Sequence, residues 1–266
     1  SIRALKAVSD YRVAVDDEDE LAATAAAQAA VEIQKDQPEN IMLWQVIIDN
    51  EIRSLRYGSA LDGLDKAIAI DPQNKDLYQG RLSVLGALED TAAIEQQLKE
   101  MIEIYPEDES SRMSLVRWYV SQGQLDDAES YLRGAIDPDD EDPESRMVLL
   151  RFLTELRGQE AGLVEVNRMI ESGQTAPIFQ SLKAGLEFEL GDEDQAIADM
   201  QSLVETLGEN DEARRIKVGL AQMLEETGNS VGARALVEEV GATGREIRIA
   251  SRVFQSELEI ARRVAE

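Results

Sequence analysis

The fold of this chain is decided by one stretch, IMLWQVIIDNEIRSLRYGSALDGLDKAIAIDPQN, which spans residues 41–74. Five of its residues occupy positions 4, 20, 24, 27 and 32 of a 34-residue unit, namely Trp44, Ala60, Leu64, Ala67 and Pro72. A unit of this length, with characteristic residues at these positions, is typical of two helices joined by a turn, and we name the two helices A and B. Proline also recurs at the same interval outside the stretch, at Pro38 and Pro106. The stretch is therefore one member of a repeated series.

The 34-residue register continues through five consecutive units, which start at Ile41, Lys75, Glu109, Pro143 and Pro177. A small side chain at position 20 lets the two helices of a hairpin approach closely, and this position reads Ala60, Ile94, Ala128, Gly162 and Ala196. Because Ile94 is bulkier than the others, we expect the second of these units to be slightly splayed. Glycine at position 15 of two units, Gly123 and Gly191, predicts the turn between the helices.

Two of the units are related in sequence, since SRMSLVRWYV at residues 111–120 aligns without a gap with SRMVLLRFLT at residues 145–154. Such self-similarity indicates duplication within a stacked array. On these motifs the chain resembles the tetratricopeptide repeat (TPR) family, and more diffusely the TPR proteins of the bacterial cell envelope. The resemblance implies an all-α fold, a right-handed superhelical solenoid of about seven TPR-like hairpins with a C-terminal capping helix. Its expected units lie near residues 1–40, 41–74, 75–108, 109–142, 143–176, 177–210 and 211–240.

The two ends of the array differ. The acidic run at residues 16–20 is interpreted as a helix start, because carboxylates cap free N–H groups there, and it lacks the spacing of a calcium loop. After Gly208 the register slips by about three residues, which lengthens either a connection or the front of an A helix. Residues 245–266 place apolar side chains on one helical face, and we expect a C-terminal cap or a docking helix for another chain there. The N-terminal end has no comparable cap and is a candidate surface for self-association.

Composition narrows the possible functions. The chain has no cysteine and no histidine, which leaves out thiol or histidine catalysis and zinc or copper sites built from these residues. We therefore expect no catalytic residues, no metal and no cofactor. The net charge of −27 repels phosphate, so we expect no nucleic-acid partner, and no apolar run is long enough for direct membrane insertion. Arginine outnumbers lysine 20 to 7, a ratio associated with bacteria whose genomes have a high GC content. The sequence leaves three compartments open for this protein, the periplasm, the cell envelope and the cytoplasm.

The TPR resemblance places a partner-binding groove along the A helices, at positions 2, 5, 9 and 12 of each unit. The residues selected from these positions are Gln45, Asp49, Gln79, Met113, Arg117, Met147 and Arg151. The Lys and Asn residues with which the family clamps a peptide carboxylate are missing, because position 5 reads Gln, Gln, Met, Met and Ser. Binding of a chaperone tail is therefore not expected.

Arg117 and Arg151 hold the same groove position in adjacent units, each one turn after a methionine. Two guanidinium groups of this kind grip a carboxylate or a phosphate bidentately. The alternative is that Arg151 pairs with Glu155 and Arg117 with acids of the neighbouring unit, which balances a very acidic chain. The aromatic residues at positions 4 and 10, such as Trp44, Tyr78, Trp118 and Phe152, are interpreted as packing residues.

The sequence thus predicts a non-catalytic scaffold that binds a peptide or helix of a partner protein in its groove. Two alternatives stay open at this point. The first is that the chain is an adaptor segment of a longer envelope lipoprotein or enzyme. The second is that it is a helical repeat that reads RNA, and the negative charge of the chain disfavours this second alternative.

Overall fold

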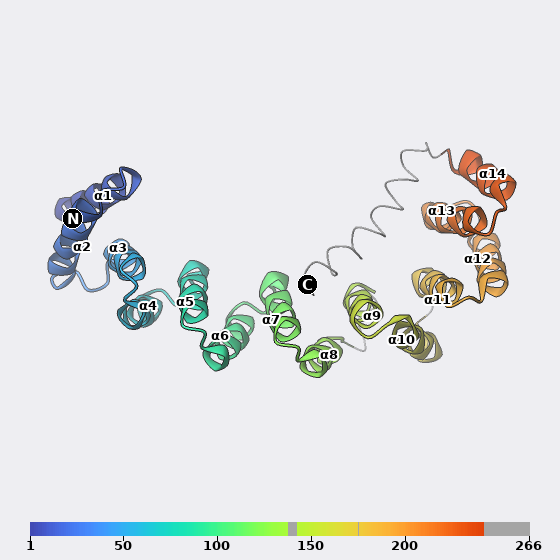
Figure 1. The fold of residues 1–266 in the computed structure, drawn as a ribbon, viewed down its shortest axis with the longest axis horizontal. Coiled ribbons are helices and arrows are strands. Elements are labelled where there is room, and N and C mark those ends of the chain that lie inside the picture. The colour runs from blue at the N-terminus through green and yellow to red at the C-terminus, as the bar shows by residue number, and fades with distance from the viewer. Residues whose placement is uncertain (138–142, 175, 242–266) are drawn as a thin grey trace. The chain divides into compact units, whose positions relative to one another are not determined.

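The computed structural model describes residues 1–137, 143–174 and 176–241, and all regular secondary structure in these ranges is helical. The helices in chain order are α1 (Ile2–Asp16), α2 (Glu20–Gln34), α3 (Ile41–Arg53), α4 (Tyr57–Ile70), α5 (Lys75–Ala87), α6 (Thr91–Ile104), α7 (Glu109–Ser121), α8 (Leu125–Gly134), α9 (Glu144–Leu156), α10 (Gln159–Glu171), α11 (Pro177–Glu189), α12 (Glu193–Leu207), α13 (Asp211–Glu226) and α14 (Ser230–Val240), labelled in Figure 1. The predicted all-α fold is confirmed for this part of the chain. The expected C-terminal helix at residues 245–266 lies outside the described residues.

The helices follow the predicted interval, since from Ile41 on every second helix begins 33 to 35 residues after its predecessor. We name the odd-numbered helices A helices and the even-numbered ones B helices. The A helices from α3 to α11 have 13 residues each, whereas α13 has 16. The residues inserted after Gly208 therefore lengthen the front of an A helix, the second of the two options that the sequence left open.

The turn between an A and a B helix uses left-handed backbone at position 15 in four of the five units from Ile41, and at position 16, Gly158, in the unit from Pro143. Gly123 and Gly191 have φ of 70° and 101°, which confirms the predicted turns. Leu55 and Glu89 adopt φ of 57° and 54° at the same position, although a side chain disfavours this conformation. The turn geometry is therefore retained even where its preferred residue is absent.

The side chain at position 4 ties the start of an A helix to the preceding loop. Trp44 Nε1 donates to the carbonyl of Pro38 at 2.9 Å, and the Tyr78 hydroxyl donates to the carbonyl of Pro72 at 3.0 Å. Arg112 makes the same contact with the carbonyl of Pro106 at 2.6 Å. Trp44 and Tyr78 are also buried, so their predicted packing role is confirmed. The recurring proline marks the loop whose carbonyl receives this hydrogen bond.

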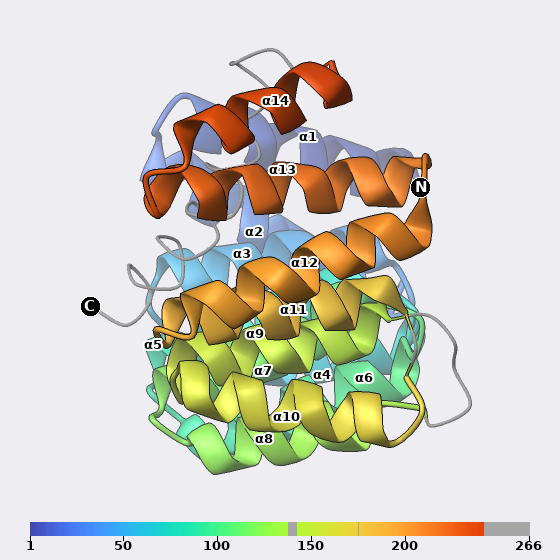
Figure 2. The same ribbon diagram turned by 90° about the vertical axis from the view of Figure 1, so that its right-hand side faces the viewer.

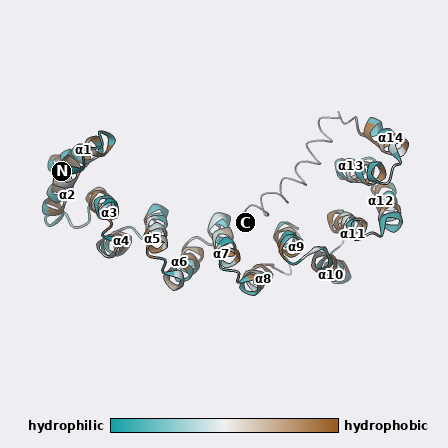
Figure 3. Ribbon diagram, viewed as in Figure 1, coloured by the Kyte–Doolittle hydropathy of each residue, from teal (hydrophilic) through white to brown (hydrophobic). Residues whose placement is uncertain are grey.

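The chain forms two compact units, Ser1–Trp118 and the residues from Tyr119 onward, each considered by itself. In the first unit, apolar side chains of α1, α2 and α3 form one core, and those of α3, α4 and α5 form another. In the second, α11 to α14 share a core that includes the buried Phe188, and Figure 2 shows α11, α12 and α13 running one above another. Figure 3 shows hydrophobic and hydrophilic stretches alternating along the helices, as expected where only one face of each is packed.

The small residues at position 20 lie at the crossings of A and B helices. Ala60, Ala128 and Ala196 are all completely buried. At Gly162 on α10 the approach is closest, since a Cβ there would lie 2.2 Å from Thr154 Oγ1 on α9. The predicted reason for small residues at this position is therefore confirmed.

Candidate functional site

All seven predicted groove residues lie on A helices. Gln45, Asp49, Gln79, Arg117 and Arg151 are exposed, and Met113 and Met147 are half-buried. Arg117 on α7 belongs to the first compact unit and Arg151 on α9 to the second. Each residue is thus accessible in its own unit, and a joint grip by the two arginines stays a prediction.

Asp49 and Arg117 are among the groove residues that also make contacts within the chain. Asp49 accepts a hydrogen bond of 2.7 Å from the hydroxyl of Tyr11, a buried side chain of α1. Burial, followed by the hydrogen bond to Asp49, raises the pKa of Tyr11, so the phenol stays protonated. Arg117 Nη2 donates to Ser114 Oγ at 2.9 Å. Asp49 therefore helps to hold α1 against α3, a role that its groove position did not indicate.

Charge separates the A helices from the B helices. The seven A helices carry 14 basic and 14 acidic side chains, and are neutral as a set. The seven B helices carry 5 basic and 19 acidic side chains, a net charge of −14. As a set, the A helices therefore repel neither an anionic nor a cationic surface by net charge, whereas the B helices repel anionic ones.

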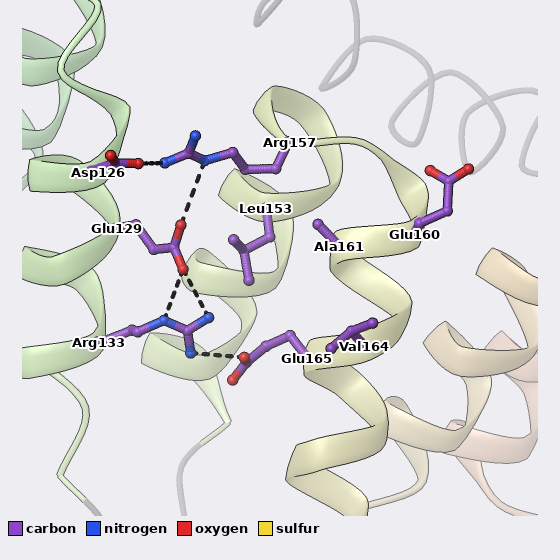
Figure 4. A pocket seen from close by; sticks show the side chains of 9 residues that line it. All are labelled: Asp126, Glu129, Arg133, Leu153, Arg157, Glu160, Ala161, Val164 and Glu165. Carbon is purple, nitrogen blue, oxygen red and sulfur yellow. Dashed lines mark hydrogen bonds and ion pairs between the residues drawn. The ribbon is translucent and has the colours of Figure 1, made fainter.

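A pocket of about 530 Å³ lies in the second compact unit, between the B helices α8 and α10 and the end of α9 (Figure 4). Its walls carry charged side chains, and its apolar part is Leu153, Ala161 and Val164. Val164 is 70% exposed, unusual for a valine within a helix that packs on both sides. The charged residues lining the pocket are Asp126, Glu129, Arg133, Arg157, Glu160 and Glu165.

Alternating charges run across this pocket as a ladder. Arg157 bonds to Asp126 and, at 3.5 Å, to Glu129, and Arg133 lies 2.9 Å from Glu129 on its own helix. Arg133 then donates across to Glu165 on α10 at 2.7 Å. We call these residues, with Arg168, the ion-pair ladder, and the dashed lines of Figure 4 follow all of it except Arg168. The ladder joins α8, the turn after α9, and α10.

Glu165 is the buried centre of the ladder, with only 3% of the residue exposed. Burial alone would raise the pKa of its carboxyl group. The hydrogen bonds from Arg168, with Nε at 3.1 Å, and from Arg133 outweigh this effect and hold the pKa of Glu165 below its usual value. Glu165 is therefore ionised in the folded chain, and both of its oxygens are occupied.

Sequence reasoning missed the ladder. The spacing of Glu129 and Arg133, four residues apart on one helix, is a recognisable signal of an ion pair. The pairing of Arg133 with Glu165 joins neighbouring hairpins at a separation of 32 residues, two short of the 34 that separate coinciding positions of the repeat. On so acidic a surface, no rule of spacing selects this glutamate from the others. Only the burial of Glu165 distinguishes it.

No group of three or more acidic side chains in the described ranges is arranged to hold a metal ion. Among the same residues, no helix has the length and apolar character that crossing a membrane requires. The charged groups of the pocket are engaged with one another, with the exception of Glu160, for which the described contacts include no ion pair.

No protein-family model matches the chain, and no curated protein matches it in sequence. Among solved structures it is similar to a tetratricopeptide repeat protein from Parabacteroides merdae, at 15% identity and a TM-score of 0.44, with 98% of this chain and 99% of that chain covered. It is also similar to YrrB, a TPR protein with an unusual peptide-binding site, at 12% identity and a TM-score of 0.39, covering 72% and 97%. A third similarity is to the complex of Naa15 and Naa10 bound to HypK-THB, at 15% identity and a TM-score of 0.47, covering 95% of this chain and 41% of that chain.

These similarities extend to a helical-repeat architecture and say nothing about a partner. The TPR resemblance rests more firmly on the chain's own helices, whose starts keep the 34-residue interval that the sequence predicted. The chain is thus a TPR-like array of helical hairpins.

Proposed function

We propose that this chain is a non-catalytic scaffold whose A helices bind a peptide or helix of a partner protein. The observation that carries the proposal is the neutrality of the A helices within a chain of net charge −27. Of the 19 basic side chains in the described helices, 14 lie on A helices, and all of these except the buried Arg146 and Lys217 offset acidic side chains there, which leaves the A helices open to partners of either charge. We also propose that the chain is divided into seven hairpin units and that these units form a right-handed superhelix.

Within this surface, Met113, Arg117, Met147 and Arg151 are the proposed centre of binding, flanked by Gln45, Asp49 and Gln79. A guanidinium that becomes desolvated against a carboxylate contributes about 1.5–3 kcal/mol, compared with about 0.2–1 kcal/mol for an exposed pair. The flexible methionines beside them adapt to apolar side chains of different shape. A partner with one acidic and several apolar side chains fits this combination.

The test is a comparison of two double variants in cells that express the tagged chain. Arg117→Ala with Arg151→Ala removes the two groove arginines. Lys66→Ala with Arg234→Ala removes the same charge from exposed positions of the B helices α4 and α14. We expect the first double variant to lose the co-purified partner and the second to keep it, with unchanged helical circular dichroism in both. Equal recovery of the partner by the two variants would remove the arginines from the proposal.

A separate part of the proposal concerns self-association through the N-terminal hairpin. Ile2, Leu5 and Val13 lie on one face of α1 and are 86%, 56% and 56% exposed. Exposed apolar side chains gathered on one helix face favour contact with another protein surface. Sedimentation at increasing concentration tests this idea, with Leu5→Glu expected to keep the chain monomeric. A chain that is already monomeric at the highest concentration would contradict it.

A further inference from the structure

We infer that the hairpin of α5 and α6 opens and closes locally in the folded chain, more readily than the neighbouring hairpin of α3 and α4 (Figure 1). Among the residues that the structure describes, four buried side-chain atoms have no hydrogen-bond partner. Three of them belong to this hairpin and to the residue that ends it, namely Arg81 Nε, Gln97 Oε1 and the Tyr105 hydroxyl. A polar atom that is buried without a partner destabilises the closed form relative to an open form that water reaches.

Gln97 is the most deeply buried member of this group, with 2% of the residue exposed. Its amide nitrogen donates to Glu100 Oε2 at 3.2 Å, whereas its amide oxygen receives no hydrogen bond. Glu165 holds the same position, 23, two units later in the chain. There both carboxylate oxygens accept hydrogen bonds, from Arg133 and from Arg168. The junction around Gln97 thus lacks the complete pairing that the ladder gives to a buried acceptor at the equivalent position.

Arg81 makes the ion pairs between hairpins at this junction, and they are long. From α5, its guanidinium nitrogens lie 3.3 Å from Asp65 of α4 and 3.7 Å from Glu100 of α6. The corresponding contact of the ladder, between Arg133 and Glu165, measures 2.7 Å. Charge-assisted hydrogen bonds are strong at about 2.7–2.9 Å and weaken at longer distances. The ion pairs of Arg81 therefore hold α6 less firmly than the ladder holds α10.

Two tyrosines of this hairpin carry the same group with and without a partner. Tyr78 of α5 and Tyr105 contact each other edge to face, with ring centroids 6.0 Å apart. The Tyr78 hydroxyl donates to the carbonyl of Pro72, whereas the buried Tyr105 hydroxyl bonds to no group. The effect of the unpartnered hydroxyl can therefore be measured against a partnered one in the same hairpin.

The hairpin of α3 and α4 differs in these respects. It contains none of the four unpartnered atoms, and the core that it shares with α5 includes the fully buried Ala60 and Ala67. We therefore expect α5 and α6 to open while α3 and α4 stay closed. Because Gln79 of the proposed groove lies on α5, such opening makes one part of the A-helix surface movable.

Hydrogen exchange of the backbone amides, followed by mass spectrometry of peptides from the full chain, measures local opening. Relative to their intrinsic rates, we expect amides of α5 and α6 to exchange at least about fivefold faster than those of α3 and α4. Gln97→Met removes the unpartnered oxygen from a side chain of similar size and should slow the exchange of α5 and α6 by about fivefold. Gln96→Met makes the same change at the adjacent exposed position of α6 and should leave the exchange unchanged.

The tyrosines provide a second, matched measurement. Tyr78→Phe removes a hydroxyl that has a partner, and we expect it to speed the exchange of α5 and α6 by about fivefold. Tyr105→Phe removes the hydroxyl without a partner and should not speed the exchange. Circular dichroism of each variant checks that the chain keeps its helices.

Three outcomes would overturn the inference. The first is exchange in α5 and α6 that is no faster than in α3 and α4. The second is faster exchange in Gln97→Met, which would show that the amide oxygen has a partner in solution. The third is equal acceleration by Tyr78→Phe and Tyr105→Phe, which would show the same for the Tyr105 hydroxyl. The groove proposal is tested separately by recovery of the partner, which none of these measurements uses.

Discussion

The A helices and the B helices of this chain share a repeat and differ in what their surfaces do. Basic side chains are placed mainly on A helices, at 14 against 5, while acidic side chains number 14 and 19. On the A helices, Gly86 and Gly185 occupy groove positions with open space where a side chain would be. On the B helices, Gly162 is in close contact and Glu165 is buried. The two sets of helices thus differ in charge, with the acidic excess on the B helices and a neutral balance on the A helices.

This difference shows that the two helices of one repeat can carry different charge, one acidic and one neutral, while the length of the repeat stays the same. Acidic groups on the B helices keep a large helical surface from associating unspecifically. In the function proposed above, the neutral A helices are the surface that binds a partner. If the division holds, the same kind of substitution must have unequal effects on the two sets of helices.

The largest contrast is expected between two glycine-to-alanine substitutions. Gly162→Ala on α10 places a methyl group 2.2 Å from Thr154 Oγ1, and we expect a loss of about 2–3 kcal/mol of unfolding free energy from overpacking. Gly86→Ala on α5 meets no atom within 4 Å, and we expect a gain of about 0.5–1 kcal/mol from helix propensity. Urea unfolding followed by circular dichroism measures both.

The contact with Thr154 provides an internal check on the first substitution. Thr154→Ala removes the hydroxyl that the new methyl group would meet, so the double variant with Gly162→Ala should recover much of the loss. A double variant as unstable as Gly162→Ala alone would show that the backbone, rather than this side chain, sets the distance between α9 and α10.

The next contrast concerns charge. Glu165→Gln keeps the shape of the buried side chain and removes its negative charge from between Arg133 and Arg168, and we expect a loss of about 1–2 kcal/mol. Glu189→Gln on the A helix α11 changes an exposed glutamate and should stay within about 0.5 kcal/mol of the parent. Urea unfolding at pH 7 compares the two. Equal effects would mean that the ladder is no more than a surface ion pair.

The pH dependence sharpens the same contrast. Because the pKa of Glu165 is lower in the folded chain than its ordinary value of 4.5, its ionised form stabilises the fold at pH values above 4.5. This contribution is lost as the pH falls through the lower folded pKa. We therefore expect the difference in unfolding free energy between the parent and Glu165→Gln to be full at pH 7 and to shrink below pH 4.5. A difference that grows on acidification would contradict the assignment.

The fold was predictable from the sequence because repetition supplies many independent copies of one weak signal. A single proline or alanine does not predict a repeat. Residues similar to Trp44, Ala60 and Pro72 recur at an interval of 34 residues, and the helices begin where that interval predicts. The length of α13 was left open, because an insertion between hairpins extends either a loop or a helix without changing the pattern that follows it.

The sites were less predictable, for a different reason. Groove positions follow from the repeat, so Gln45 or Arg151 is found at once as an accessible side chain. The ladder depends on a contact between hairpins, in which Glu165, one of many glutamates, is buried and accepts a hydrogen bond from Arg133 of α8. Tyr11, which holds Asp49, lies in the hairpin that matches the repeat least well. Sequence periodicity describes what the units share, whereas each of these two contacts joins one particular pair of hairpins.

The smallest contrast tests whether the net charge of a whole helix affects stability, in addition to the charge at the C-terminal end of that helix. Glu205→Lys in the last turn of α12 and Glu189→Lys at the end of α11 each place a cation near a helix C-terminus, worth about 0.3–1 kcal/mol. The B helix α12 has four acidic and no basic side chains, whereas α11 already contains Lys183. Glu205→Lys should therefore stabilise the chain more, by a few tenths of a kcal/mol. Salt screens this difference, so it should fade between 10 mM and 500 mM NaCl in thermal unfolding. Equal gains at low salt would show that only the helix ends sense these charges, and the acidity of the B helices would then bear on partners and solubility and not on stability.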